Sequence, residues 1–371
     1  MDGAGTTSTS LRIAVTDIAA ATEFLRTRGG FDLLRIHPAD APREARLVRD
    51  GTLLDLHLGS PTGVTIVVER SGEAGSDEGH GVGPDSADVV GPDGIVVRTT
   101  VAARLTVPPV IEETSVGAGD ADGLWHVGRA GMEYRDLVPS RLGGAVIASN
   151  IRIRDAGLVP DYVHHHDVLF QLIYCRRGWV KVVYEDQGEP FLLRAGDCVI
   201  QPPGIRHRVL ENSEGMEVVE IGYPAEHMTL VEHRMKLPNG VDSGRSWHGQ
   251  TFIRYDESNR SWTTLENGIE HSDTGVKSAT AGLADVDVLR LPTGAVLDLA
   301  RTDADGFPRL VFVVEGHARV RLSEADHDLN EGSTLSLRSG DHARISATMD
   351  CVLLRVMIDA SRDVDHWRPI A

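Results

Sequence analysis

The residues best suited to chemistry are histidines near the middle of the sequence. His164 and His166 flank His165, and His207 follows a Pro-Pro-Gly turn further along the chain. Alternate residues on a β-strand share one face, so His164 and His166 would point the same way, with Cα atoms roughly 6.6 Å apart. Two imidazoles at that spacing can bind one cation, while His165 would point to the other side. Together with His207 and a side-chain oxygen, they would suit a first-row divalent metal ion.

The spacing around these histidines extends into two longer patterns. The first is His-x-His, four residues, a polar position, six residues and Gly; the second is Gly, five residues, Pro-x-Gly, two residues and His. The residues concerned are His164, His166, Gln171, Gly178, Gly196, Pro202, Gly204 and His207. Both patterns resemble the signature motifs of the cupin superfamily, except that Gln171 stands where the family usually has Glu, and Glu211 where an Asn often follows the last His. The resemblance implies a small jelly-roll barrel with a metal ion inside.

The resemblance assigns the metal to His164, His166, Gln171 and His207. One divalent ion per chain is expected; Fe is preferred, and Zn, Mn, Ni and Cu remain open on ligand type. Because all four ligands are neutral, the ion would keep its double positive charge, which favours an anionic substrate. Replacing Gln171 with Glu is therefore expected to tighten metal binding and to weaken the binding of an anionic substrate.

Two further polar residues are candidates for catalysis. Tyr162 has the strand parity of His164, and Glu211 has that of His207, so each would line the cavity or be a satisfied polar residue of the core. The segment that contains Trp247 lies between the two predicted barrels, where it would cap the pocket or serve only structure.

A second copy of the cupin pattern occupies Val286 to Ile358. Its glycines are Gly316, Gly332 and Gly340, which match Gly178, Gly196 and Gly204. The ligand positions, however, are Thr302, Ala304, Arg309 and Ala343, a set that cannot hold a divalent cation. His342 comes one place early, which on a strand turns it to the opposite face. We therefore expect a second barrel without metal, which serves packing, pocket closure or dimerisation.

The first part of the chain has a different pattern. A short apolar run from Leu11 is followed by a helix predicted over 18–27. Strand-like runs follow at 31–36, at 45–48 with 52–58 after a turn at 49–51, and at 64–69. This βαβββ order resembles one module of the vicinal-oxygen-chelate (glyoxalase-like) superfamily. The metal ligand of that family on the first strand is missing, and Glu69, at its strand-end carboxylate position, lacks partners. The segment is therefore predicted to be structural, pairing with its twin in a homodimer.

The predicted fold class is mainly β, with two jelly-roll (cupin) barrels preceded by a small α+β βαβββ module. The expected boundaries are 1–70 for the module, 71–93 for an acidic linker rich in Gly, Asp and Ser, 94–235 for the metal-binding barrel, and 236–371 for a crossing segment and the degenerate barrel. Weak helical spacing around 225–235 suggests a short helix that closes the first barrel.

The composition is that of a folded protein with an acidic surface. The 371 residues suffice for two or three domains, and the formal net charge of −18 repels phosphate backbones and anionic lipid, so we expect neither nucleic acid nor membrane as a partner. Cys175, Cys198 and Cys351 are widely spaced in apolar runs, which is typical of free thiols in a reducing compartment. Residues 1–10 show no signal-peptide pattern, so a cytoplasmic location is expected.

These features predict a metal-dependent enzyme that acts on a small, oxygenated, anionic metabolite. An iron-type oxygenase is preferred, because three neutral histidines can hold Fe(II) with positions open for substrate and O2. A redox-neutral isomerase, cyclase or lyase is the alternative, in which the ion polarises a carbonyl group, and Gln171 favours it. A non-catalytic small-molecule binding protein is the third possibility, although the helical DNA-binding motif of a sensor is not visible in the sequence.

Overall fold

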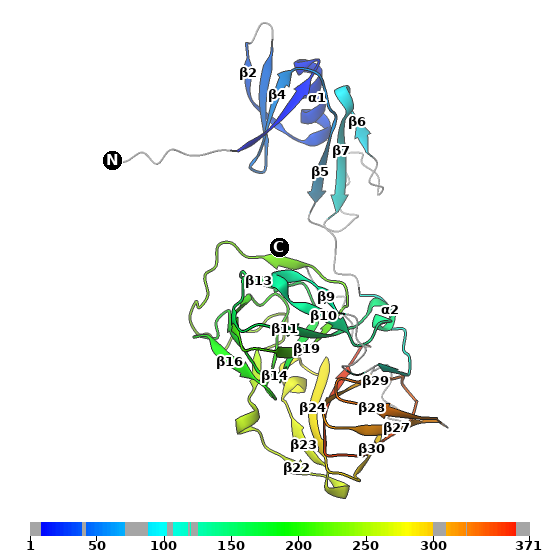
Figure 1. The fold of residues 1–371 in the computed structure, drawn as a ribbon. Coiled ribbons are helices and arrows are strands. Elements are labelled where there is room, and N and C mark those ends of the chain that lie inside the picture. The colour runs from blue at the N-terminus through cyan, green and yellow to red at the C-terminus, as the bar shows by residue number, and fades with distance from the viewer. Residues whose placement is uncertain are drawn as a thin grey trace. The chain divides into compact units, whose positions relative to one another are not determined.

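The chain forms two units, which are described separately. The computed structural model describes residues 9–38, 42–70, 88–101, 107–117, 119, 125–299, 309–323 and 325–360. Its two compact units are Met1–Arg104, the N-terminal unit, and Leu105–Ala371, the two-barrel unit (Figure 1). Most of the predicted linker therefore lies outside the described residues.

The N-terminal unit begins with one helix packed on a four-stranded sheet. Its elements are β1 (Ser10–Val15), α1 (Ile18–Gly29), β2 (Asp32–His37), β3 (Glu44–Arg49) and β4 (Thr52–Leu58). The strand order is β1-β4-β3-β2, and β1 runs parallel to β4. The side chain of Asp17 caps α1 by accepting from the amide of Ala20, and Gly30, in the left-handed region at φ 66°, ends it. Apolar side chains of α1, such as Leu25, pack with those of the sheet in one buried cluster.

The predicted strands of this unit need one correction, which concerns the last strand. The predicted pieces at 45–48 and 52–58 form the hairpin of β3 and β4, and the predicted turn is found at Asp50 and Gly51, both with positive φ. The last strand, β5 (Val64–Arg70), which carries Glu69, is absent from the four-stranded sheet. It pairs in parallel with β7 (Ile95–Val101), and β6 (Val89–Val90) completes this three-stranded sheet beside the short 3-10 helix η1 (Pro92–Gly94).

The boundary predicted at residue 94 is therefore wrong. Ile95 and Val97 are each 1% exposed and belong to the same buried cluster as Leu25. Burial of these β7 side chains with α1 adds β7 to the N-terminal unit. The predicted first barrel thus loses its first strand to the preceding unit.

The first barrel consists of two facing antiparallel sheets. Its strands are β9 (His126–Val127), β10 (Glu133–Asp136), β11 (Ile147–Ile153), β12 (Gly157–Leu158), β13 (His164–His166), β14 (Phe170–Arg177), β15 (Trp179–Tyr184), β16 (Phe191–Arg194), β17 (Cys198–Ile200), β18 (His207–Asn212), β19 (Met216–Tyr223), β20 (Thr229–Val231) and β21 (Ile253–Tyr255), with the short helices η3 (Arg129–Gly131) and α2 (Arg141–Gly144). One sheet has the order β21-β17-β14-β19-β11-β10-β9 and the other β16-β15-β18-β13-β20, where β12 also joins β18. Apolar side chains of both sheets, among them Ile151, Val182 and Val218, form a common core.

The helix expected over 225–235 does not form, although every residue of that range is described. β20 occupies part of it instead and pairs with β13, with Val231 opposite His164. This pairing uses the backbone groups that a helix would have bonded within itself.

The second barrel has the same architecture but a filled interior. Its strands are β8 (Ser115–Gly117), β22 (Thr263–Thr264), β23 (Glu270–Asp273), β24 (Ala284–Leu291), β25 (Val296–Leu299), β26 (Arg309–Glu315), β27 (Ala318–Leu322), β28 (Ala325–Leu329), β29 (Thr334–Leu337), β30 (Ala343–Ala347) and β31 (Cys351–Ile358), with the short helices η4 (Glu257–Asn259), η5 (Glu266–Gly268) and α3 (Val276–Ala279). The two sheets have the orders β22-β23-β24-β31-β26-β29-β8 and β25-β30-β27-β28. Buried side chains such as Leu297, Val313 and Ile345 occupy the space between them.

The two barrels exchange strands and share a core. β8 precedes the first barrel in sequence but pairs with β29 of the second, and β21 of the crossing segment pairs with β17 of the first. One buried cluster joins Leu172 and Tyr174 of β14 to Val286 and Phe312 of the second barrel. The expected boundary at 235 therefore separates segments that fold together, and the second barrel packs against the wall that carries Gln171.

Candidate metal centre

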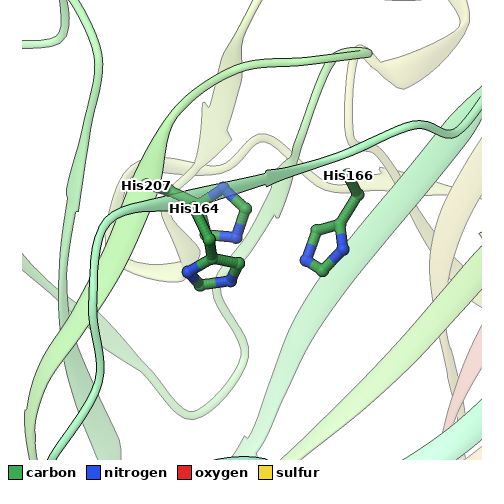
Figure 2. A group of neighbouring side chains, drawn as sticks. All are labelled: His164, His166 and His207. Carbon is green, nitrogen blue, oxygen red and sulfur yellow. The ribbon is translucent and has the colours of Figure 1, made fainter. Parts of the chain in front are cut away.

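Three imidazoles meet inside the first barrel. β13 supplies His164 and His166 on one face, and β18 supplies His207 directly opposite His164 in the antiparallel register. Each of the three offers one ring nitrogen, and these three nitrogens all lie within 4.8 Å of one another. Figure 2 shows the three rings gathered from the two strands. The predicted histidine set is thus brought together.

Backbone carbonyl groups fix how two of these rings face. Nδ1 of His164 lies 2.8 Å from the carbonyl oxygen of Tyr162, and Nδ1 of His207 lies 3.0 Å from that of Ile205. A carbonyl oxygen only accepts, so Nδ1 carries the proton and Nε2 keeps its lone pair. Nε2 of His164 is buried and has no hydrogen-bond partner among the described residues. This is the arrangement of a metal-binding histidine, whose other ring nitrogen donates to an outer partner.

Burial keeps the three imidazoles neutral. It lowers the pKa of His164 and takes the pKa values of His166 and His207 well below the ordinary value, since a charged ring loses its hydration inside the barrel. After burial, the imidazoles of His207 and His164 add to the lowering of the pKa of His166, and that of His164 adds to the lowering of the pKa of His207. Neutral rings are the form that binds a metal ion, so no protons need to leave them at neutral pH.

Gln171 supplies an oxygen on the same cavity wall. The residue is 1% exposed, and its Oε1 is buried with no hydrogen-bond partner in the described part of the chain. Its Nε2 donates to Oε1 of Glu220 at 2.5 Å. Sequence reasoning missed Glu220, although a charged residue inside the apolar run of β19 was a signal that it faces something polar.

The cavity beside the centre has a volume of about 440 Å³. His166, Gln171 and His207 line it together with Glu220. Its walls are otherwise largely apolar and include Met132, Ile151, Ile173, Val180, Val182, Val209, Met216 and Val218. Such a space fits a small organic molecule with an apolar body.

Polar residues that the sequence did not reveal also line this cavity. The ring of His227 lies edge-on to His166, with centroids 5.3 Å apart, and its Nδ1 is 3.0 Å from the carbonyl oxygen of Pro224. Arg129 lines the same cavity and is paired with the buried carboxylate of Asp161. No spacing rule links these residues to the histidine motifs, because Arg129 comes from η3 and His227 from the loop between β19 and β20.

Neither predicted catalytic residue lines the cavity. Tyr162 is 42% exposed, because it lies in the loop before β13, where strand parity does not apply. In β18 the register shifts: Val209 is opposite Val182, but Glu211 is opposite Lys181, so one extra residue bulges between them. A bulge reverses the faces beyond it, and Glu211 therefore lines a separate surface depression together with Lys181.

The predicted ligand positions of the second barrel form no histidine centre among its described residues. Ala343 is fully buried in the apolar core, and His342, one place earlier, is exposed and hydrogen-bonded to Asp298 at 2.5 Å. The side chain of Arg309 is buried, and its Nη2 donates to the carbonyl oxygen of Asp341 at 3.4 Å. The remaining predicted positions, Thr302 and Ala304, lie outside the described residues.

Comparisons with known proteins agree with this geometry. Residues 156–222, which contain all four predicted ligands, match the family model described as Cupin domain. The Lactobacillus farciminis oxalate decarboxylase in its formate complex shares the fold with 12% identity and a TM-score of 0.51 over 68% of this chain and 89% of that chain. A variant of the Bacillus subtilis oxalate decarboxylase shares it with 14% identity and a TM-score of 0.50 over 71% and 81%. No curated protein sequence gives a significant match.

Proposed function

Since this chain is a two-barrel member of the cupin superfamily, we propose that it is an enzyme with one divalent metal ion, held in the first barrel by His164, His166, Gln171 and His207. Two buried atoms carry the proposal, Nε2 of His164 and Oε1 of Gln171. Neither has a hydrogen-bond partner among the described residues. Burying such atoms without a partner costs free energy, which a bound cation would offset.

The protein's own residues would hold and orient the reacting molecule. An ion at this position supplies a Lewis acid, and iron supplies a redox centre for O2 as well. Fe is the preferred metal, and Zn, Mn, Ni and Cu also suit the ligand types. The apolar walls exclude water from the body of the substrate and leave its polar end beside the histidines.

The proposed substrate is a small oxygenated molecule, anionic at the end that faces the metal and apolar elsewhere. Four neutral ligands leave the ion's charge uncompensated in the ligand set, which favours an anion. Glu220 lowers the net charge of the site from about +2 to about +1, so a single negative charge on the substrate suits it better than two.

An iron-type oxygenase remains the preferred reaction, and a redox-neutral isomerase, cyclase or lyase is the second candidate. The second is favoured by two groups that can hold a proton at the cavity wall, the carboxylate of Glu220 and the imidazole of His227. Both adjoin proposed ligands, since Glu220 accepts from Gln171 and the ring of His227 lies beside that of His166.

The experiment is metal analysis of protein purified without added ions, combined with O2 uptake on small hydroxy and keto acids with apolar bodies. Iron with substrate-dependent O2 uptake supports the oxygenase, and zinc or manganese with turnover but no uptake supports the redox-neutral reaction. The His207→Ala variant is the control for metal-dependent turnover. Binding of these acids without any turnover in the metal-loaded protein would instead support a binding function.

We further propose a cytoplasmic homodimer formed through the N-terminal unit. The order β1-β4-β3-β2 leaves β1 and β2 as sheet edges without strand partners among the described residues, and such edges tend to pair with another chain. The three cysteines are buried free thiols, as suits a reducing compartment. Among the described helices, none has the length and apolarity to cross a bilayer.

A further inference from the structure

One carboxylate holds the amide of Gln171. Nε2 of Gln171 donates to Oε1 of Glu220 at 2.5 Å, while the opposite end of the amide, Oε1, is buried without a hydrogen-bond partner in the described part of the chain. Both residues line the cavity that His166 and His207 also line. The glutamine thus has one end engaged and the other available.

The two ends of a glutamine amide differ in what they can do for a cation. The carbonyl oxygen can coordinate it, whereas the NH2 group only donates hydrogen bonds and repels it. A carboxylate only accepts hydrogen bonds, so Glu220 binds the NH2 end. Turning the amide over would set two oxygens against each other. Glu220 therefore selects the orientation in which Oε1 of Gln171 is left for an ion.

The register of two strands makes this contact possible. β14 and β19 are antiparallel, with Gln171 opposite Gly222 and Ile173 opposite Glu220. Glu220 is thus a diagonal neighbour of Gln171, a distance that long side chains can bridge. Gly222 has no side chain to compete for the space beside Gln171, and a Cβ there would lie 3.0 Å from Cγ2 of Ile147.

We propose that Glu220 is a positioning residue of the metal centre. It holds the Gln171 amide so that Oε1 is available to the ion. Through the same hydrogen bond it places a negative charge next to Gln171, a ligand that has no charge of its own. The inference rests on the proposed metal site. Partners that orient a ligand typically change metal affinity about 10- to 100-fold when they are removed.

The role of Glu220 changes the expected result of Gln171→Glu. Ligand charge alone predicts tighter metal binding for that variant. With Glu220 in place, the substitution sets two carboxylates within hydrogen-bond distance, and their repulsion offsets the gain. Combining Gln171→Glu with Glu220→Gln exchanges the two side chains, which restores an amide donor beside a carboxylate acceptor.

The test is titration of the metal-free, full-length protein with Co²⁺, followed by its visible absorption. Glu220→Met removes the acceptor at similar volume and is expected to weaken Co²⁺ binding at least about tenfold and to alter the spectrum. Glu220→Gln retains an acceptor and is expected to lose less. Glu226→Gln is the matched control, because Glu226 is an exposed carboxylate on the wall of the same cavity, and it is expected to bind Co²⁺ as the wild type does.

The exchange variant is expected to bind Co²⁺ more tightly than Gln171→Glu alone. Wild-type affinity and spectrum in both Glu220 variants, or equal affinity of Gln171→Glu and the exchange variant, would overturn the positioning role. Thermal unfolding without metal identifies a variant that fails to fold; if Glu220→Met does, Glu220→Gln and the exchange variant decide. A wild-type protein that binds no Co²⁺ would overturn the proposed metal site and this inference with it.

Discussion

At the scale of single residues, the centre depends on which atoms are already engaged. Backbone carbonyl groups take Nδ1 of His164 and Nδ1 of His207, and Glu220 takes Nε2 of Gln171. Each contact engages an atom that would not bind the metal and leaves the other polar atom of the same side chain, Nε2 of the histidine or Oε1 of the glutamine, available to bind it. The proposed ligands are therefore oriented before any ion arrives, which would lower the entropic cost of binding one.

Metal binding is expected to depend on the first barrel alone. His207→Ala removes a proposed ligand that is 5% exposed, and we expect metal content below about a tenth of the wild-type value by elemental analysis. His342→Ala is the matched control, since it removes an exposed histidine of the second barrel. Arg309→Ala, at a former ligand position, is likewise expected to retain the metal. Loss of metal in either second-barrel variant would contradict the assignment of the metal site to the first barrel.

The buried carboxylate of Asp161 is expected to stabilise the first barrel. Its side chain is fully buried, pairs with Arg129 and accepts from the amide of Val209 at 3.0 Å. Asp161→Ala leaves both donors without this acceptor, and we expect a loss of about 3 kcal/mol in the free energy of unfolding, measured by urea denaturation. Asp328→Ala, which breaks the exposed pair with Arg319, is expected to cost less than about 0.5 kcal/mol. An equal loss of unfolding free energy in the two variants would show that burial of the Asp161 pair does not determine its contribution to stability.

At the scale of elements, one bulge decides which side chains of β18 face the cavity. Val209 lines the cavity, but Glu211, two positions further on, faces outward because the register with β15 shifts between Val182 and Lys181. Simple alternation therefore holds from His207 to Val209 and fails one step later. An extra residue in a strand is a property of the pairing and leaves no fixed mark in local composition.

The hairpin of β3 and β4 gives a prediction about pH. Arg46 lies opposite Asp55 and binds it through two hydrogen bonds, which lowers the pKa of Asp55 to about 2. The folded state thus holds that proton more weakly than the unfolded chain. This contribution to stability is complete above about pH 4 and is lost as pH falls toward about 2.

Asp55→Asn is expected to remove this contribution, about 1 kcal/mol because solvent screens the partly exposed pair. The difference in unfolding free energy between wild type and variant should therefore be present at pH 6 and shrink between about pH 4 and pH 2. Asp50→Asn is the control, since Asp50 is exposed at the tip of the same hairpin. If the difference in unfolding free energy grew on acidification, its sign would be opposite to that expected from the lowered pKa of Asp55, and this assignment would be refuted.

At the scale of the whole molecule, the chain divides after residue 104, with separate buried clusters on the two sides. A protein that begins at Leu105 keeps every residue of the two barrels. We expect it to bind metal as the full chain does, to retain turnover, and to shift from dimer to monomer in light scattering. Loss of metal in a well-folded truncated protein would show that the N-terminal unit completes the centre. A truncated protein that stays dimeric would place the dimer contact in the barrels.

The sequence by itself determined which three histidines come together, the mainly β class and the unsuitable residues Arg309 and Ala343 at predicted ligand positions of the second barrel. These features depend on local spacing: His164 and His166 share a face because strand side chains alternate, and His342 misses the interior because it comes one place early. Geometry of this kind depends only on residues that are close together in the sequence.

Only the tertiary structure decided what surrounds those histidines. Glu220 meets Gln171, and Asp161 meets Arg129, across gaps of 49 and 32 residues in the chain. The exchange of β8 and β21 between barrels and the move of β7 to the N-terminal unit depend in the same way on which strands pair. The choice of strand partners is made by burial and backbone pairing over the whole fold, so residue spacing alone could not reveal the carboxylate behind the glutamine.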